Sequence, residues 1–381
     1  MNLHNKLRNI WRKRVEYKFI KGYWKKFDTI KKSSPEYFAP EPNEKEYLEK
    51  WNTLGYPIKI DTYRVFSKFV KNDINLFPIE LFPVLIEPVL SPKLTAICFE
   101  EKNLYDRLFA GVDFDGGILP ETLFRNMAGS YMDAEYRVFN PKKDVLFDFL
   151  NGEDEIIIKP SIDSGGGKGI EFFERIGNEF INKEGDKLSC EYLDRQFKKD
   201  FICQKLLKQS KFGKQFNASS INTVRVRCYK SVLNHEIHIL NNELRIGGVG
   251  SKVDNKNSGG VFCPLKRDGS FSNYVLDLLA VKYGKFNGVD FENTNFRIAN
   301  FEKVLNFAKM ICECITTSHL ISLDIALCEN DQLRLVEVNI TGFDTWSITP
   351  SLGSHLGEFT DEIINYCVEH IDENPIGIAA Y

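Results

Sequence analysis

The sequence predicts an α+β fold in which two mixed lobes follow a helical region. The first indication is residues 155–172, where two short strand-like runs flank a glycine-rich loop. The second is the pair of mostly apolar runs at 321–329 and 333–340, which is typical of a β-hairpin around a short polar turn. The third is the helical spacing of apolar residues in 1–30 and 301–318.

We divide the chain of 381 residues into three parts. Residues 1–92 form an N-terminal helical region, residues 93–209 a first lobe and residues 210–381 a second lobe. The second boundary depends on the polar loop 210–220, which follows a predicted buried strand at 200–203. The smaller elements that we expect are helices at 44–54, 63–70 and 101–109, a helix at 301–318 capped by Asn300, and strands at 136–139, 235–240 and 244–246.

The glycine-rich loop and the strand before it carry the strongest functional signal. Ile156–Ile158 is a β-branched run typical of a buried strand, and Lys159 follows it, so an ammonium group lies where the strand leaves the core. Ser161–Gly169 contains four glycines, whose backbone N–H groups can approach an anion because no Cβ intervenes. The pattern predicts a flap over the phosphates of a nucleotide. A glycine-rich hairpin without a ligand is the alternative.

Two common phosphate-binding loops are excluded. A Walker A loop requires Ser or Thr after Gly-Lys, whereas Gly169 follows Lys168 here, and Ile162 occupies the place of the first glycine. A Rossmann pattern that starts at Gly165 fails at Ile170.

The composition indicates a cytoplasmic protein. A net charge of −3 argues against nucleic acid as a partner of the whole chain, and the nine cysteines contain no Cys-x-x-Cys pair that would suggest zinc. We find neither an apolar run of 18 residues nor the apolar core of a secretory signal.

Residues 6–26 predict a basic amphipathic helix, with nine Lys or Arg residues against the single acid Glu16. One interpretation is an interfacial helix on an anionic membrane, at the inner face of the cell membrane. The favoured interpretation is a helix whose aromatic face packs on the protein body. The apolar stripe of this helix is Leu7, Trp11, Val15, Phe19 and Tyr23, widened by Ile10, Ile20, Trp24 and Phe27.

The strand 223–229 alternates between apolar and polar side chains. Val224 and Val226 are expected to face the core, whereas Arg225 and Arg227 are expected to face outward. Two arginines on one strand face make an anion-binding surface, and a solvated edge strand is the alternative.

The hairpin 321–340 predicts a metal site. If Asn330 and Asp331 form the tip of a symmetric hairpin, Asp324 lies opposite Glu337, and Asn339 lies on the same face. Two facing carboxylates at ~5 Å repel each other by on the order of 3 kcal/mol at an effective dielectric of ~20. A Mg²⁺ ion would reverse the sign of that interaction. A solvated acidic face is the alternative.

The order of these parts resembles the ATP-grasp superfamily, which implies two α+β lobes gripping ATP between them. The finer resemblance is to its sugar-transfer-associated branch, which is found with bacterial surface (capsular) polysaccharide synthesis, and it covers about residues 93–368. The motifs that carry it are Lys159-Pro160-Ser161, Gly165-Gly166-Gly167-Lys168-Gly169, Asn222-Thr223-Val224-Arg225, Asp254-Asn255, Gly259-Gly260 and Gly342-Phe343-Asp344.

The resemblance implies a role for each candidate site residue. The implied ATP-binding residues are Lys102, Lys159, Ser161, Ser164, Gly165, Gly166, Gly167, Lys168, Gln204, Lys205, Leu206, Leu207 and Gln209. The implied Mg²⁺ ligands are Asp324, Glu337 and Asn339; the implied catalytic arginines are Arg225 and Arg245; the implied substrate residues are Asn222, Asp254, Asn255 and Asp344.

The chemistry of that superfamily implies a ligase. The γ-phosphoryl group of ATP would pass to a carboxylate, and an amine would attack the acylphosphate to form an amide. The branch implies a uronic-acid sugar or glycan as the carboxylate and an amino acid or other amine as the nucleophile. The alternatives are an ATP-dependent kinase acting on a glycan hydroxyl, and a nucleotide-binding scaffold attached to a membrane synthesis complex.

Overall fold

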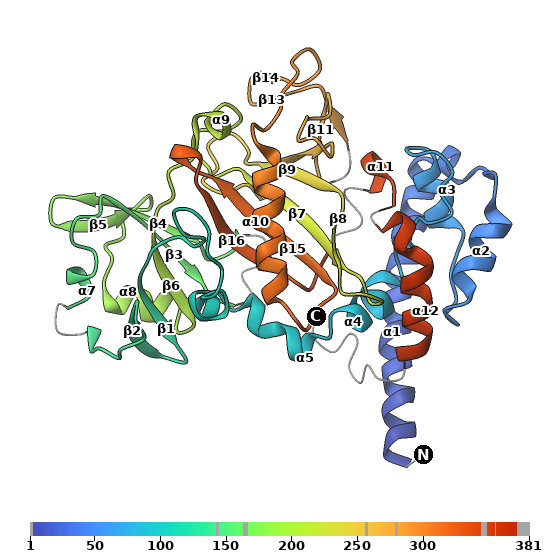
Figure 1. The fold of residues 1–381 in the computed structure, drawn as a ribbon, viewed down its shortest axis with the longest axis horizontal. Helices are drawn as coiled ribbons and strands as arrows, with labels where there is room; N and C mark the ends of the chain where they lie inside the picture. The colour runs from blue at the N-terminus through green and yellow to red at the C-terminus, as the bar shows by residue number, and fades with distance from the viewer. Residues whose placement is uncertain are drawn as a thin grey trace.

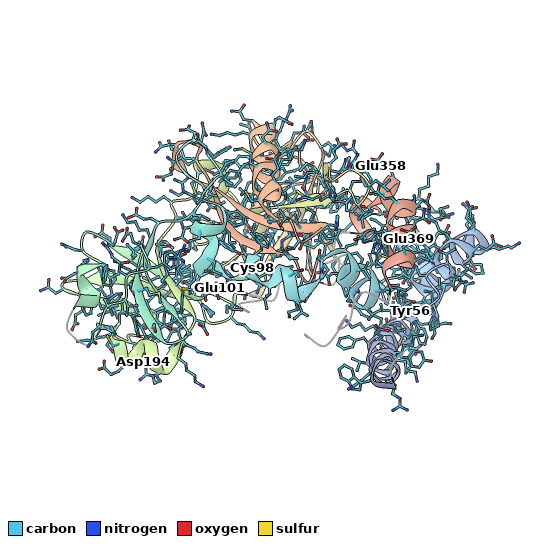
Figure 2. All side chains as sticks on the ribbon, turned by 60° about the horizontal axis from the view of Figure 1, so that its bottom comes forward. Tyr56, Cys98, Glu101, Asp194, Glu358 and Glu369 are labelled. Atoms are coloured by element: carbon cyan, nitrogen blue, oxygen red, sulfur yellow. The ribbon has the colours of Figure 1, made fainter. Side chains whose placement is uncertain are left out.

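The computed structural model describes residues 3–141, 145–162, 167–255, 258–278, 281–343, 349–354 and 356–371. Figure 1 shows a first sheet lobe on the left, a second sheet lobe in the centre and a helical region on the right. In Figure 2, Cys98 and Glu101 lie where the two sheet lobes meet, whereas Tyr56 and Glu369 belong to the helical region.

The first lobe is built on a six-stranded antiparallel sheet with the order β2-β1-β6-β3-β4-β5. Its core is a compact cluster of aromatic and aliphatic side chains, including Phe173, Phe180 and Phe201. The helix α8 (Cys190–Gln196) packs on it, and the Ser189 hydroxyl caps α8 by accepting from the Tyr192 N–H. The strands are β1 (Thr122–Met127), β2 (Ser130–Asp133), β3 (Glu155–Pro160), β4 (Glu171–Ile176), β5 (Glu179–Asn182) and β6 (Phe201–Lys205).

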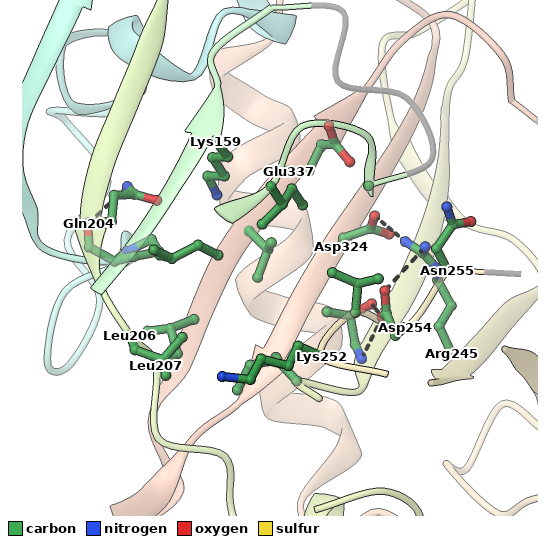
Figure 3. Close-up of a pocket in the computed structure, with 18 of the residues that line it drawn as sticks. Lys159, Gln204, Leu206, Leu207, Arg245, Lys252, Asp254, Asn255, Asp324 and Glu337 are labelled. Carbon is green, nitrogen blue, oxygen red and sulfur yellow. Dashed lines mark hydrogen bonds and ion pairs between the residues drawn. The ribbon is translucent and has the colours of Figure 1, made fainter. Parts of the chain in front are cut away.

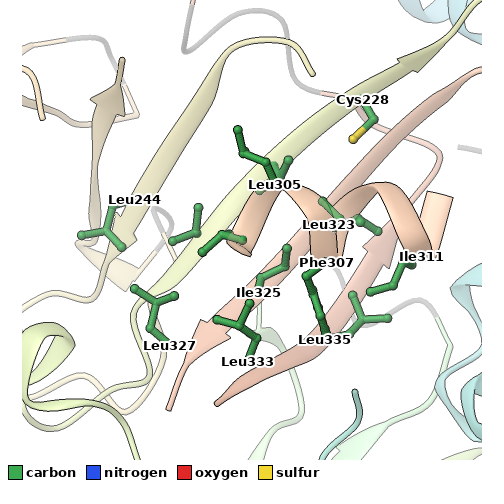
Figure 4. Packing of buried hydrophobic residues seen from close by; sticks show 14 of the residues in the cluster. Cys228, Leu244, Leu305, Phe307, Ile311, Leu323, Ile325, Leu327, Leu333 and Leu335 are labelled. Atoms are coloured by element: carbon green, nitrogen blue, oxygen red, sulfur yellow. The ribbon is translucent and has the colours of Figure 1, made fainter. Parts of the chain in front are cut away.

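The second lobe is built on an eight-stranded sheet. The strand order is β12-β11-β10-β9-β7-β15-β16, and β8 also pairs with β7. The helix α10 (Phe301–Cys314) covers one face, where Phe307 and Ile311 pack on Leu323, Ile325 and Leu335 (Figure 4). The strands are β7 (Thr223–Lys230), β8 (Ile237–Ile239), β9 (Asn242–Ile246), β10 (Val261–Leu265), β11 (Val275–Leu276), β12 (Lys282–Tyr283), β15 (Leu320–Leu327) and β16 (Leu333–Asn339).

The strand β7 lies in the middle of this sheet and is buried on both faces. Val224, Val226 and Cys228 face α10, as the alternation predicts. The expectation that Arg227 faces outward is wrong, and so is the alternative of a solvated edge strand, because Arg227 and Tyr229 are both fully buried. The end of that face near Thr223 borders the cleft between the lobes, and the end at Tyr229 joins the core of the helical region.

The hairpin of β15 and β16 contains a β-bulge, which the predicted symmetric hairpin does not include. Asp324 pairs with Glu337, as the symmetric hairpin predicts. Nearer the turn the prediction is wrong by one residue, because Ile325 pairs with Leu335 and Val336 is left over. As a consequence, two successive side chains, those of Val336 and Glu337, line the cleft.

The helical region joins the two ends of the chain. Its core contains Ile20 and Phe27 of α1 (Leu3–Ser33), together with Ile363 and Cys367 of α12 (Thr360–His370). Packing of α1 on the body is therefore confirmed for this part of the helix. Trp11, which we assigned to the apolar stripe, is instead 56% exposed. Smaller members of the region are α2 (Glu44–Asn52), α3 (Asp61–Ser67), α4 (Glu87–Leu90) and the π-helical turn η2 (Phe82–Ile86).

A short helical segment connects the lobes. Its members are α5 (Lys93–Ala96), η3 (Ile97–Glu100), η4 (Lys102–Leu104) and α6 (Tyr105–Leu108), so the predicted helix at 101–109 is confirmed in two pieces. The Glu100 carboxylate accepts the backbone N–H groups of Ile340 and Thr341 at 2.8 Å each, directly after β16. The Lys102 N–H donates to the Ser161 carbonyl after β3. The segment therefore ties the two sheets together beside the cleft.

Two local predictions are wrong. Residues 136–139 are no strand, because Tyr136 has a positive φ of 65° and takes part in a turn. Asn300 precedes α10 with a φ of 52°, and its side chain forms no capping hydrogen bond.

Within the described ranges, no single helix is long and apolar enough to cross a membrane. The bent pair Phe82–Leu90 and Lys93–Glu100 satisfies that test by length and composition alone, and the apolar side chains of Phe82–Leu90 are almost all buried in the core.

Candidate active site

A cavity of about 320 Å³ lies between the two sheet lobes. Gln204, Leu206 and Leu207 line one side, and Asp324, Arg245 and Asp254 line the opposite side (Figure 3). The cavity thus has a predominantly apolar end near β6 and a charged end over β7, β15 and β16.

The apolar end is formed where β6 runs out into the second lobe. Ile157 of β3, Phe172 of β4 and Val336 of β16 line it together with Leu207. In the part of the chain that the structure describes, the backbone N–H groups of Leu206 and Leu207 form no hydrogen bond. A slot with apolar walls and free backbone donors on its rim suits a flat heteroaromatic ring. Lys205 borders the slot, but its ammonium pairs with Glu121 at 2.8 Å and Glu153 at 3.0 Å.

Two lysines line the cavity between its ends. Lys159, at the end of β3, is 6% exposed, and no described residue accepts a hydrogen bond from its Nζ. Burial, helped by the nearby ammonium of Lys102, lowers the pKa of Lys159 to about 8, although the Glu337 carboxylate opposes the shift. The Nζ atom of Lys102 lies 2.7 Å from the Oε1 atom of Glu337 and forms an ion pair with it. Since a buried ammonium without an acceptor is costly, an anion in the cavity would stabilise Lys159.

An arginine pair holds Asp324 at the floor of the charged end. Arg225 lies opposite Asp324 on the neighbouring strand and donates to both of its oxygens, at 2.7 and 2.8 Å. Arg245 donates to the same carboxylate at 2.6 Å. Burial alone would raise the pKa of Asp324, but the two guanidinium groups more than offset it and hold that pKa well below its ordinary value.

Arg245 also pairs with Asp254, at 3.2 Å. The Asp254 carboxylate accepts from the Thr223 N–H at 3.0 Å and from the Thr223 hydroxyl. Burial raises the pKa of Asp254 despite these partners. The charges therefore alternate from Asp254 through Arg245 and Asp324 to Arg225.

The predicted repulsion between Asp324 and Glu337 is wrong for the protein as it folds. Each acid has its own cation, because Asp324 binds the two arginines and Glu337 binds Lys102. The cations come from β7, β9 and the segment between the lobes, which lie far from the hairpin in sequence.

Glu337 and Asn339 are the better candidates for a metal. Both line the cavity from β16, and Asn339 has a buried side-chain nitrogen without a hydrogen-bond partner among the described residues. Carboxylate and amide oxygens suit Mg²⁺, so these residues fit the ion. No cluster of three or more His, Cys, Asp or Glu side chains suited to a metal occurs in the described ranges, so the site depends on this amide and on oxygens from a ligand. Asp324 lies beside them, with both oxygens already accepting hydrogen bonds.

The glycine-rich flap touches a loop of the second lobe. A Cβ on Gly167 would lie 3.5 Å from Val253 and 3.8 Å from the Asn255 amide. In addition, Lys252 pairs with Glu174 of β4 at 3.0 Å and lies over the Phe172 ring. Sequence reasoning missed Lys252, Val253 and Phe172 as cavity residues, since the contact forms only when the lobes come together.

Several predicted site residues do not line the cavity. Gln209 and Asn222 are buried beside it and bond to each other, because the Gln209 Oε1 accepts from the backbone N–H and the amide of Asn222. Most of their other hydrogen bonds hold the backbone of loop 213–220, and the Asn222 Oδ1 also accepts from the Gly247 N–H. Ser161 is buried, and Lys168 is exposed at the flap. Ser164, Gly165, Gly166 and Asp344 lie outside the described residues.

Comparisons with solved structures found chains of similar architecture at low identity. One is the VanG D-Ala:D-Ser ligase from Enterococcus faecalis, with 12% identity and a TM-score of 0.40 over 72% of this chain and 62% of that chain. Another is the D-alanine–D-alanine ligase from Bacillus anthracis, with 13% identity and a TM-score of 0.40 over 74% of this chain and 71% of that chain. A third is the N5-carboxyaminoimidazole synthetase from Staphylococcus aureus complexed with ADP, with 11% identity and a TM-score of 0.38 over 71% of this chain and 52% of that chain.

The match to VanG thus spans less than two thirds of that ligase. A search of curated proteins found no match. A family model, in contrast, matches most of the chain. The family described as sugar-transfer associated ATP-grasp matches residues 91–352, which include both sheets and every residue named in the cavity. The chain therefore belongs to the sugar-transfer-associated ATP-grasp family.

Proposed function

We propose that the chain is an ATP-dependent carboxylate–amine ligase that forms an amide through an acylphosphate. The observation that carries the proposal is one cavity with an apolar slot at one end and, at the other, two lysines, two arginines and a carboxylate–amide pair. The slot suits adenine, and the charged end suits a triphosphate.

The triphosphate would lie along the lysines. Lys159 and Lys102 would neutralise phosphate oxygens, and the flap at 164–169 would cover them with backbone N–H groups. Glu337 and Asn339, with Asp324 behind them, would hold Mg²⁺. When bound, the ion would neutralise phosphate oxygens at the site of transfer.

The chemistry then needs mainly positioning. A carboxylate oxygen of the acceptor attacks the γ-phosphorus, the bond to ADP breaks, and an acylphosphate forms. An amine next attacks the acyl carbon and releases phosphate and a proton. Arg225 and Arg245 lie at the charged end, where the γ-phosphoryl group would be transferred, and their guanidinium groups would stabilise the charge that develops there.

The family description supports a carbohydrate acceptor. We propose a uronic-acid carboxylate of a bacterial surface polysaccharide, or of its precursor, and an amino acid or other amine as nucleophile. Asp254 and Asn255, which line the cavity from the loop after β9, are the candidates for the acceptor pocket, together with Asp344 outside the described residues.

A test is to measure ADP release with a panel of uronic acids and amines, each alone and in pairs. A ligase releases stoichiometric ADP only when both partners are present, and mass spectrometry detects the amide. ADP release with a sugar alone, accompanied by a phosphorylated product, would instead identify a kinase.

Substitution of Lys159 tests whether ATP binds in this cavity. Lys159→Ala should weaken ATP binding by at least tenfold, because a phosphate–ammonium contact within a protein contributes on the order of 1.5–3 kcal/mol. Lys187→Ala is the matched control, since Lys187 is 63% exposed and pairs with Glu179 at the edge of the first sheet. Equal ATP affinity in the two variants would exclude Lys159 from the nucleotide site.

A further inference from the structure

The exposed side of α1 is a continuous basic stripe. Ile20 and Phe27 mark the buried side of the helix, at 1% exposure each. At 100° per residue the opposite side contains positions 11, 14, 18, 21, 25 and 32. These residues are Trp11, Arg14, Lys18, Lys21, Lys25 and Lys32, and all are exposed.

No acid compensates this stripe along its central part. Glu16 is 3% exposed on the opposite side of α1, where it accepts a hydrogen bond from the Tyr56 hydroxyl at 2.8 Å. Asp28 is the other acid of α1 and lies at the margin of the stripe, between Lys25 and Lys32 in sequence. Among the described side chains, Arg14, Lys18 and Lys25 have no carboxylate partner.

Trp11 lies in line with these cations and away from the core. Its side chain is 56% exposed, and Tyr17, at the flank of the stripe, is 43% exposed. Figure 1 shows the beginning of α1 extending beyond the rest of the molecule, so nothing drawn there covers this end of the helix. Exposed tryptophan beside lysines is typical of helices that lie at the boundary of a bilayer.

We infer that the exposed side of α1 binds the surface of an anionic membrane. The stripe from Trp11 to Lys25 is about 21 Å long at 1.5 Å per residue, which allows four cations to reach lipid headgroups together. The lipid would contribute phosphate-based negative charge, and the Trp11 ring would enter the headgroup region. The region lies outside the matched residues 91–352, so this property is independent of the proposed ligase reaction.

The test is co-sedimentation of the full chain with vesicles of phosphatidylcholine, with and without phosphatidylglycerol. We expect binding only to the anionic vesicles, and binding should weaken as NaCl rises from about 0.05 to about 0.3 M. Each lysine near such a surface contributes about fivefold to the partition coefficient, so Lys18→Ala with Lys25→Ala should lower it about 25-fold. Trp11→Ala should weaken binding without changing its salt dependence.

The matched control is Lys183→Ala with Lys187→Ala, which removes two lysines that are 79% and 63% exposed on the first lobe. This variant should bind like the wild type, and thermal unfolding verifies that both double variants are folded. The inference is overturned if the wild type ignores phosphatidylglycerol at low salt, or if the two double variants lose binding equally. Binding to soluble polyphosphate without binding to vesicles would overturn it as well.

Discussion

Lys159 connects the proposed nucleotide site with the energetics of folding. Its pKa falls to about 8 in the folded protein, whereas an unfolded lysine titrates near 10.4. Between these values the unfolded chain holds more protons, so the free energy of unfolding rises with pH. We predict that the wild type gains on the order of 3 kcal/mol relative to Lys159→Met across this window.

Urea unfolding of the two proteins at the two ends of the window measures this gain. Because Lys159→Met removes only this titration, other groups cancel in the difference. Parallel pH profiles would mean that Lys159 is not buried as an ammonium.

Asp324 is the carboxylate that pairs with both arginines of the cavity. Asp324→Asn leaves Arg225 and Arg245 without their carboxylate, and breaking a buried ion pair from one side costs about 3–5 kcal/mol. Glu179→Gln is the control, because it breaks an exposed pair with Lys187 that contributes about 0–1 kcal/mol. Urea unfolding in a chelating buffer should therefore separate the two variants clearly. Equal stabilities would mean that the arginines find other partners.

For single residues, the sequence indicates which side chains belong to the site but not which side chains they pair with. Lys159, Asp324 and Glu337 could be selected because each follows or interrupts a strand of apolar residues. Their counterions come from distant segments, so no local pattern could reveal them. Gln209 and Asn222 show the converse, since both were selected for the site but bond to each other and to the backbone of a buried loop.

Among the elements, the bulge in β16 adds the Val336 side chain to the wall of the cavity. Deleting Val336 would remove the extra residue and restore a regular hairpin. Leu335 and Glu337 would then be neighbours on opposite faces, so Leu335 stays in the core and Glu337 stays in the cavity. We predict that the deletion variant still binds ATP, but about tenfold more weakly because the apolar slot loses one side chain, as measured by calorimetry.

Val336→Ala is the control for the deletion, because it keeps the length of the strand and should lower the ATP affinity by a similar amount, within about tenfold. A deletion variant that binds no ATP, beside a Val336→Ala variant that does, would show that the bulge itself is needed to place Glu337.

The elements with strong periodicity were predictable, as the helix α10 and the hairpin of β15 and β16 show. The bulge was not predicted, because the symmetric hairpin overlooked a change of phase: apolar residues lie at odd positions up to Leu335 and at even positions from Val336 onward. β2 was missed and 136–139 was mistaken for a strand, since short edge segments depend on pairing with a neighbour more than on their own residues.

In the molecule as a whole, the helical region acts as a structural part of the second lobe. Phe27 is 1% exposed and meets Phe38 edge to face, with ring centroids 6.5 Å apart. Phe27→Ala should therefore cost about 3–5 kcal/mol of unfolding free energy. Val368→Ala, on α12 and 46% exposed, is the control, and we expect it to cost less than about 1 kcal/mol. Thermal unfolding compares them, and similar losses would contradict the packing of α1.

The two lobes and their order along the chain could be predicted, because the strand and glycine-rich loop of residues 155–172 precede the hairpin of residues 321–340. The return of α12 to the N-terminal helices could not. Ile363 and Cys367 of α12 share one core with Ile20 and Phe27 of α1, and no periodicity within either helix specifies a partner more than 300 residues away.

This packing of α12 with the helices of residues 1–92 has a consequence during synthesis. Those helices leave the ribosome before Ile363 and Cys367, which complete their core and lie about 270 residues further along the chain. At about 5–20 residues per second, roughly 15–55 s pass between the two events. For that time the nascent chain carries an unfinished apolar surface, which makes it a natural client of ribosome-associated chaperones. A premature stop anywhere before α12 would leave that surface open for good.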